Sequence, residues 1–110
     1  MNGDGTPFML LRARPKPGAR EAFDHWFRTV HLVDVRKIPG VVRATGGWTS
    51  GGTRLGFYYF ADAEAVGSAL ESPEAAYARG TWSQWAVNLE ELGVEIMAPL
   101  VTLPMYEATS

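Results

Sequence analysis

The chain has 110 residues, of which 46% are hydrophobic, and its ten basic and twelve acidic residues give a net charge of −2 at pH 7. This length allows one globular domain with a core of its own, and the near balance of scattered charges argues against a nucleic-acid-binding protein. The chain contains no cysteine, which excludes disulfides, thiolate metal sites and cysteine nucleophiles.

The amino terminus shows no targeting segment. Its first seven residues are polar and rich in glycine, whereas a signal peptide needs an apolar stretch. No apolar run is long enough to cross a bilayer. We therefore expect a cytoplasmic protein that binds neither a membrane nor a nucleic acid.

The first half of the chain predicts three strands and one long helix. Pro15 and Pro17-Gly18 end the first strand, and Pro39 disfavours helical geometry at the residue before it, so the helix stops shortly before that proline. Ser50-Gly51-Gly52-Thr53 is typical of a hairpin turn. The predicted elements are strands at 8–14, 41–49 and 54–60 and a helix from about 19 to 36 or 37.

The second half predicts helical segments followed by a strand. Asp62 and Ser72 are potential N-caps, and Thr81-Trp82-Ser83-Gln84 fits a capping box. Behind that box, apolar residues at helical spacing predict a helix that Pro99 ends; they are Trp82, Trp85, Ala86, Leu89, Leu92 and Ile96. The last predicted strand covers 100–107, and Pro104 within it favours a sheet edge.

The order of these elements is that of the ferredoxin-like β-α-β-β-α-β fold, an α+β fold with an antiparallel sheet. We expect a single domain over residues 8–107, with flexible termini at 1–7 and 108–110. In the strands at 8–14 and 54–60 consecutive residues are apolar, so both faces of the sheet are apolar. Because the helices cover only one face, a second copy of the chain is the simplest cover for the other, and we predict a homodimer.

His31 is the candidate catalytic residue of the long helix. At 100° per residue it lies about 100° from the centre of an apolar stripe, whose members are Phe23, Trp26, Phe27, Val30 and Val33. Asp34 falls near the middle of that stripe, three residues on, and can meet His31. It would orient the imidazole and raise its pKa towards neutrality, which suits general acid–base catalysis. Alternatively, His31 bonds a backbone carbonyl and Asp34 belongs to a fraying helix end.

Aromatic residues form the candidate substrate-binding set. Those expected to line a pocket between helices and sheet are Trp26, Phe27, Trp48, Tyr58, Trp82 and Trp85. Such a lining suits a flat apolar or aromatic ligand, although the alternative is that most of these side chains are core. His25 projects from the side of the helix opposite His31, so the two imidazoles cannot converge on a metal ion. We expect neither a metal nor a cofactor.

With the residues laid out in this way, the chain resembles the EthD-like family of dimeric α+β barrels. The most specific matching segment runs from the helix aromatics through His31 to Pro39-Gly40. The full set of matches is Pro17-Gly18, Phe23, Trp26, His31, Pro39-Gly40, Tyr58-Tyr59-Phe60, Ser72-Pro73-Glu74 and Tyr106-Glu107. Val33 departs from the pattern, because family members often carry proline there.

The resemblance implies a barrel built from the sheets of two subunits, with a cavity between helices and sheet in each. Proteins of this architecture include cofactor-free monooxygenases, polyketide cyclases, lactone isomerases and haem-degrading enzymes, so the fold alone does not select a reaction. Relatives that degrade haem carry an asparagine in the first strand, and this strand has none.

We therefore predict a cofactor-independent enzyme that acts on a small hydrophobic cyclic or aromatic compound by cyclisation, isomerisation or oxygenation. His31 is its general acid or base, and Asp34 orients His31. The alternative is a non-catalytic homodimer that binds a small apolar ligand, which would show no pH dependence around the histidine pKa.

Overall fold

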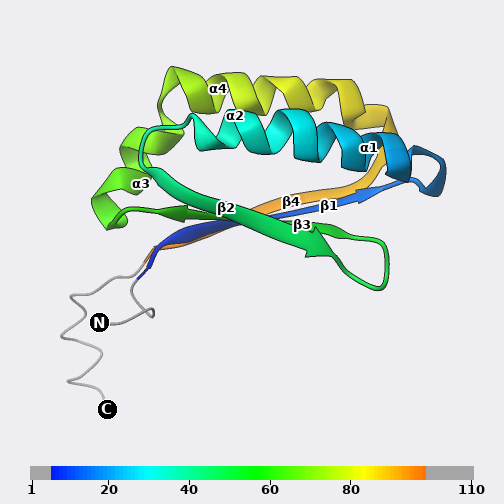
Figure 1. The fold of residues 1–110 in the computed structure, drawn as a ribbon, viewed down its shortest axis with the longest axis horizontal. Coiled ribbons are helices and arrows are strands. Elements are labelled where there is room, and N and C mark those ends of the chain that lie inside the picture. Colours follow the sequence, from blue (N-terminus) through cyan, green and yellow to red (C-terminus); the bar gives the residue numbers. More distant parts are fainter. Residues whose placement is uncertain (1–5, 99–110) are drawn as a thin grey trace, which may run out of the picture.

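The computed structural model describes residues 6–98, which form a four-stranded antiparallel sheet with helices over one face (Figure 1). The strands are β1 (Phe8–Pro15), β2 (Val41–Trp48), β3 (Arg54–Phe60) and β4 (Leu89–Met97), and their order in the sheet is β2-β3-β1-β4. This arrangement confirms the predicted ferredoxin-like α+β fold. The predicted bounds of β3 are confirmed, and those of β1 and β2 differ by one residue.

The long predicted helix is present but contains an irregular turn. It consists of α1 (Arg20–Trp26), a π-helical turn (Phe27–His31) and α2 (Leu32–Arg36). A π turn closes its hydrogen bonds over one more residue than an α turn, so the later side chains rotate by about 100° relative to a regular helix. The face turned to the sheet therefore continues through His31 and Val35.

The π turn corrects the predicted apolar stripe. Phe23, Trp26 and Phe27 are buried, as the stripe predicts, but Val30 and Val33 are 38% and 40% exposed. These two valines would face the sheet in an unbroken α-helix, and the extra residue turns them towards solvent.

Two shorter helices begin at the predicted caps. In α3 (Ala63–Leu70) the Asp62 carboxylate accepts a hydrogen bond from the Ala65 amide at 2.9 Å. In α4 (Pro73–Gly80) the Ser72 hydroxyl accepts one from the Ala75 amide at 3.1 Å. Both caps satisfy amide groups that the first helical turn leaves unpaired.

The predicted helix beyond α4 is wrong. Thr81 Oγ1 donates to the Ala78 carbonyl at 2.8 Å instead of capping a new α-helix, and a 3-10 segment (Thr81–Asn88) follows. The chain from Leu89 to Met97 then pairs with β1 as β4. The strand predicted at 100–107 lies outside the described residues, as do most of the termini predicted to be flexible.

The core lies between the helices and the sheet. Phe23 and Phe27 pack there against Leu11 and Ala13 of β1 and against Tyr58 of β3. A second buried cluster fills the end of the sheet under α3 and α4, and its largest members are Ile38, Phe60 and Val66. The cavity described below lies between these two clusters, because residues of both line it.

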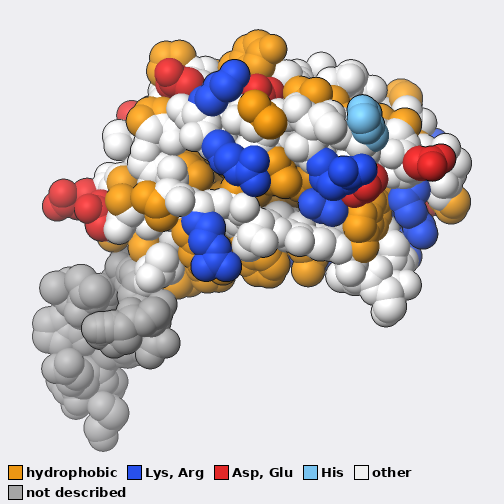
Figure 2. All heavy atoms as spheres, in the orientation of Figure 1, with side chains coloured by type: hydrophobic (Ala, Val, Ile, Leu, Met, Phe, Trp, Pro, Cys, Tyr) orange, Lys and Arg blue, Asp and Glu red, His pale blue; other side chains and the backbone are white. Residues whose placement is uncertain are grey.

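The opposite face of the sheet carries no helix among the described residues (Figure 1). Phe8, Phe57 and Tyr59 form a half-buried aromatic cluster on it, with ring centroids 5.8 to 6.2 Å apart. Figure 2 shows basic and acidic side chains interspersed with hydrophobic ones on one face of the molecule. Within residues 6–98, no helix has the length and apolar character needed to cross a membrane.

Candidate functional site

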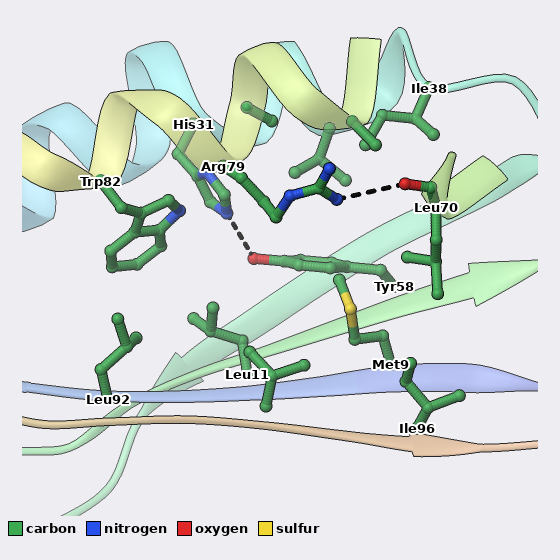
Figure 3. A pocket seen from close by; sticks show the side chains of 14 residues that line it. Met9, Leu11, His31, Ile38, Tyr58, Leu70, Arg79, Trp82, Leu92 and Ile96 are labelled. Atoms are coloured by element: carbon green, nitrogen blue, oxygen red, sulfur yellow. Dashed lines mark hydrogen bonds between the residues drawn. The ribbon is translucent and has the colours of Figure 1, made fainter. Parts of the chain in front are cut away.

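An apolar cavity of about 440 Å³ lies between the helices and the sheet (Figure 3). This volume falls in the range of small-molecule sites. Its walls come from several elements: Met9 and Leu11 of β1, His31, Val35 and Ile38, Tyr58, Leu70, Ala75, Ala78, Arg79, Trp82, and Leu92, Val94 and Ile96 of β4. The three β4 side chains are 45–50% exposed, so the cavity is open to solvent along that strand.

The buried polar side chains of this cavity are those of one histidine and one tyrosine. His31 is 3% exposed and Tyr58 is 1% exposed. The Nε2 atom of His31 lies 2.7 Å from the Tyr58 hydroxyl oxygen, the distance of a strong hydrogen bond (Figure 3). Arg79 is the third polar residue of the lining, and its guanidinium donates to the Leu70 carbonyl at 3.2 Å.

Aromatic rings hold the His31 imidazole in place. Trp26 stacks on it with a centroid distance of 5.4 Å, and Phe27 and Trp82 approach it at 4.8 and 4.9 Å. The stack between Trp26 and His31 joins residues five apart in sequence, which is the spacing that the π turn brings onto one face. The Nδ1 atom is buried and has no hydrogen-bond partner among the described residues.

Burial keeps this pair uncharged. Desolvation, reinforced by the positive charge of Arg54, lowers the pKa of His31 to about 4. Desolvation also raises the pKa of Tyr58 above its ordinary value of 10, with Arg54 acting in the opposite direction. At neutral pH the site therefore holds a neutral imidazole and a neutral phenol, which corrects the predicted rise of the His31 pKa.

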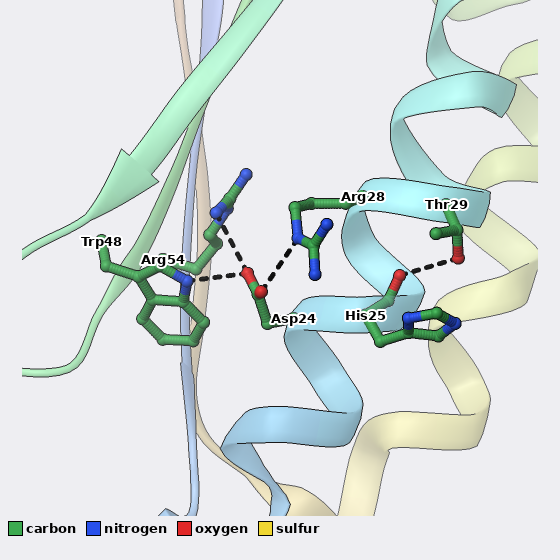
Figure 4. Close-up of polar contacts among 6 residues, drawn as sticks. All are labelled: Asp24, His25, Arg28, Thr29, Trp48 and Arg54. Atoms are coloured by element: carbon green, nitrogen blue, oxygen red, sulfur yellow. Dashed lines mark hydrogen bonds and ion pairs between the residues drawn. The ribbon is translucent and has the colours of Figure 1, made fainter.

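Arg54 belongs to a polar network that the sequence analysis missed (Figure 4). Its Nη1 atom lies 3.2 Å from Asp24 Oδ1, which also accepts a hydrogen bond from the Trp48 indole at 2.8 Å. Arg28 donates to the other carboxylate oxygen at 2.9 Å. Burial acts to raise the pKa of Asp24, but the hydrogen bonds from Trp48 and Arg28 outweigh it and lower that pKa. The carboxylate is therefore ionised and partners the buried guanidinium.

The two-residue period of β3 could have indicated that Arg54 is buried and takes part in this network. Arg54, Gly56, Tyr58 and Phe60 are buried, whereas the residues between them are half-buried. Residues two apart on a strand share a face, so the pattern that places Tyr58 inside also places Arg54 inside. The guanidinium lies over the Phe27 ring, with Cζ 4.4 Å from its centroid.

Asp34 does not take its predicted position. It borders a separate, smaller pocket with Lys37, Glu74 and Tyr77. Its Oδ2 atom has no hydrogen-bond partner among residues 6–98, and the partner of His31 is Tyr58. The predicted pairing of Asp34 with His31 is wrong, because the π turn brings His31 fully onto the buried face and leaves Asp34 at its edge.

The predicted aromatic set divides into three groups. Tyr58 and Trp82 line the cavity together with His31. Trp26 and Phe27 stand behind His31 and pack on its ring, and Trp85 packs on Phe23 with ring centroids 5.2 Å apart. Trp48 lies outside the cavity, where its indole bonds Asp24.

No cation site is visible in the described part of the chain. Among residues 6–98, no three His, Asp or Glu side chains lie close enough together to hold a metal ion. His25 is exposed, and its backbone carbonyl accepts a hydrogen bond from the Thr29 hydroxyl at 2.7 Å (Figure 4).

Comparison with known proteins identifies the fold. No family model matches the chain, and no curated protein matches its sequence. Among solved structures, it is similar to an ethyl tert-butyl ether D (EthD) family protein of Bacillus halodurans, with 21% identity and a TM-score of 0.67 over 86% of this chain and 99% of that one. Rv0793 of Mycobacterium tuberculosis gives 22% identity and a TM-score of 0.66 over 86% and 95%.

A third similar structure is SnoaB of Streptomyces nogalater, described as a cofactor-independent oxygenase. It is 18% identical, with a TM-score of 0.65 over 91% of this chain and 98% of SnoaB. At these identities the likeness establishes a shared fold, the one expected from the resemblance to EthD-like proteins, and leaves the reaction to be argued from the site.

Proposed function

We propose that this protein is a cofactor-independent, oxygenase-like enzyme that acts on a small hydrophobic cyclic or aromatic compound by acid–base chemistry. One observation carries the proposal: a buried His31, hydrogen-bonded to Tyr58 at 2.7 Å, in the wall of an apolar cavity of about 440 Å³. The fold shared with SnoaB and with two proteins described as putative antibiotic biosynthesis monooxygenases supports this class of activity.

The charge state of His31 decides which proton it can take. An imidazole with a pKa of about 4 is unprotonated at neutral pH and ready to accept a proton, but it is a weak base. The proton must therefore be acidic, as on a phenol or on a carbon flanked by carbonyl groups. Because Nε2 is bonded to the Tyr58 hydroxyl, the proton passes through that hydroxyl: it gives its proton to Nε2 as its oxygen takes the proton of the substrate. The hydroxyl re-formed in this way can then donate a hydrogen bond to the substrate oxygen on which negative charge develops.

The carbanion or phenolate formed in this way has two fates. Attack on molecular oxygen makes the overall reaction an oxygenation, whereas attack within the same molecule makes it a cyclisation or an isomerisation. An oxygen electrode separates them, because only the first consumes dissolved oxygen. Polycyclic phenols and cyclic 1,3-diketones that fit the cavity are the compounds to assay.

Substitution of His31 tests the proposal directly. His31→Asn and His31→Ala should lower kcat/KM by about 10² or more, the usual contribution of a positioned general base. His25→Asn, on the exposed side of the same helix, is the matched control and should keep wild-type activity. Folded His31 variants with normal turnover would rule out this role.

A non-catalytic binding protein is the second candidate, and the apolar lining of the cavity favours it. Such a protein needs the same walls but no base. It would bind the assay compounds without turnover and with equal affinity above and below the pKa of His31. Turnover that falls as the pH approaches about 4 would instead support the enzyme.

The homodimer is part of the same proposal. The helix-free face of the sheet presents Phe8, Phe57 and Tyr59. The Cζ atom of Arg43 lies 5.1 Å from the Tyr59 ring centroid. An aromatic cluster of this kind on an uncovered sheet face is typical of a surface that a partner covers. We propose that the partner is a second copy of the chain.

A further inference from the structure

Gly56 lies on the inner face of β3, between Arg54 and Tyr58. A methyl group added at Gly56 would lie 2.7 Å from the Tyr58 hydroxyl oxygen, 2.9 Å from its Cζ and 3.0 Å from its Cε1. Carbon atoms in close contact lie about 3.5 to 4.0 Å apart. The phenol ring of Tyr58 therefore fills the space that any other residue at position 56 would occupy.

The space over Gly56 determines where the phenol ring of Tyr58 lies. Tyr58 follows Gly56 by two residues, so both side-chain positions face the cavity side of the sheet. The ring lies back along its own strand over Gly56, and this places the hydroxyl 2.7 Å from His31 Nε2 (Figure 3). With a side chain at position 56, the end of the phenol ring must move from the place where its hydroxyl meets His31.

The requirement concerns the phenol rather than the backbone. Gly56 is not among the described glycines with positive φ, which are Gly40 and Gly52, so an alanine can adopt its backbone conformation. All three near contacts are to the distal part of the Tyr58 side chain, which can rotate away. The neighbouring Gly46 differs, because a methyl group there would collide with the Leu55 carbonyl of the backbone.

We propose that Gly56 is a positioning residue, which holds the Tyr58 hydroxyl against His31 by leaving room for the phenol ring. It touches no substrate and acts only through Tyr58. The consequence for turnover rests on the proposed acid–base function, whereas the positioning itself is a property of the protein without ligand.

The test uses nitrogen NMR of the His31 imidazole in protein without ligand. Tyr58→Phe removes the hydroxyl and should shift the Nε2 resonance of the wild-type protein. In a Gly56→Ala background, the same Tyr58→Phe change should leave that resonance unmoved, because the hydroxyl has already left Nε2. If Tyr58→Phe shifts Nε2 equally in both backgrounds, the proposal is wrong.

Gly47→Ala is the matched control. Gly47 lies on the neighbouring strand β2, and a methyl group there would meet nothing within 4 Å. In its background, Tyr58→Phe should shift Nε2 as in the wild type. A control that abolishes this shift would show that any added methyl group in the sheet has the effect, which would overturn the specific role of Gly56.

Folding of the variants provides a second measure. If Gly56→Ala does not fold, Gly56→Ala/Tyr58→Leu should fold, because leucine lacks all three atoms of Tyr58 that the added methyl group would meet. Failure of this double variant would mean that Gly56 accommodates something other than the phenol ring, and would contradict the proposal.

Kinetics separate this inference from the proposed function. With a substrate in hand, Gly56→Ala should lower kcat by about tenfold to hundredfold with KM little changed, as expected when a reacting group is displaced by about 1 Å. If the NMR result holds but His31→Asn retains activity, the positioning stands and the acid–base function fails. If Tyr58→Phe shifts Nε2 equally in both backgrounds, the positioning role of Gly56 is wrong, whatever activity Gly56→Ala retains.

Discussion

At the scale of single residues, the fold suppresses the charge of His31. The imidazole is 3% exposed, aromatic rings surround it, and the nearby guanidinium of Arg54 repels a proton. A protonated His31 would be a buried cation beside another cation, which is costly. A neutral imidazole that avoids this cost is also the form that can accept a proton from a substrate.

This burial should make stability depend on pH. The unfolded chain protonates His31 near pH 6.5 and the folded chain only near pH 4. Between these values the unfolded state binds the extra proton, so the free energy of unfolding falls as the pH falls, by up to about 3 kcal/mol. Urea unfolding between pH 7 and pH 4 should show this loss in the wild type and less of it in His31→Asn.

His25→Asn controls for histidine removal itself. His25 is exposed on the same helix, and its replacement should leave the wild-type dependence in place. If His31→Asn and the wild type lose stability in parallel over this range, His31 is not the group responsible, and its burial as a neutral base is wrong.

Arg79 should give the cavity a preference for acidic ligands. It is the charged side chain of the described lining, and the hydrogen bond that it makes among residues 6–98 is an exposed contact to the Leu70 carbonyl. A ligand carboxylate can take the place of that carbonyl and form a charge-assisted hydrogen bond. Naphthoate should therefore bind about tenfold more tightly than naphthamide, measured by calorimetry.

Arg79→Gln should remove most of this difference and leave naphthamide binding little changed. Arg36→Gln, an exposed arginine of α2 outside the lining, should preserve it. Equal affinity of the wild type for both ligands would contradict an anion-binding role for Arg79.

At the scale of elements, the π turn is the feature that sequence periodicity could not supply. The spacing of Phe23, Trp26 and Phe27 correctly predicts a buried helix face, but projecting the same period onward places Val33 inside and His31 at the margin. The structure reverses this, with Val33 40% exposed and His31 at 3%. One extra residue in a turn changes every later position, and residue types alone do not reveal where it is inserted.

Two valines test this register. Val35 is 2% exposed and Val33 is 40% exposed, and both lie in α2. Val35→Asn buries an amide and should cost about 2–4 kcal/mol of unfolding free energy. Val33→Asn should cost about 0.5 kcal/mol or less. Urea denaturation measures both, and the opposite ranking would mean that the helix is regular and Val33 faces the core.

The carboxyl-terminal strand was missed for a different reason. Leu92 and Ile96 are four residues apart, and that spacing places two side chains on one face of a strand as well as of a helix. Val94, two residues from each, fits only the strand, and all three line the cavity. The helical stripe that begins at Trp82 concealed this change of period, because its early members do lie in a helical segment of the 3-10 type.

At the scale of the whole molecule, the order of the helices and strands could be predicted from the sequence, whereas the site could be predicted only in part. Turn residues and the caps Asp62 and Ser72 fix the boundaries locally, so strand–helix–strand–strand–helix–strand could be inferred from the chain alone. The contact between His31 and Tyr58 joins residues 27 apart in sequence. Its geometry depends on a π turn and on the space over Gly56, and neither has a periodic signal.

The same fold leaves one face of the sheet for a partner, and this predicts the state of the protein in solution. The helices lie on the other face (Figure 1), and Phe8, Phe57 and Tyr59 are clustered where no described element covers them. Light scattering at micromolar concentration should give twice the mass of the 12.0 kDa chain.

Phe57→Glu places an unpaired charge in the proposed interface and should give a folded monomer. Val87→Glu, 74% exposed in the segment between α4 and β4, should remain dimeric. A monomeric wild type would remove the second subunit from the proposal, and a dimeric Phe57→Glu would move the interface to another surface.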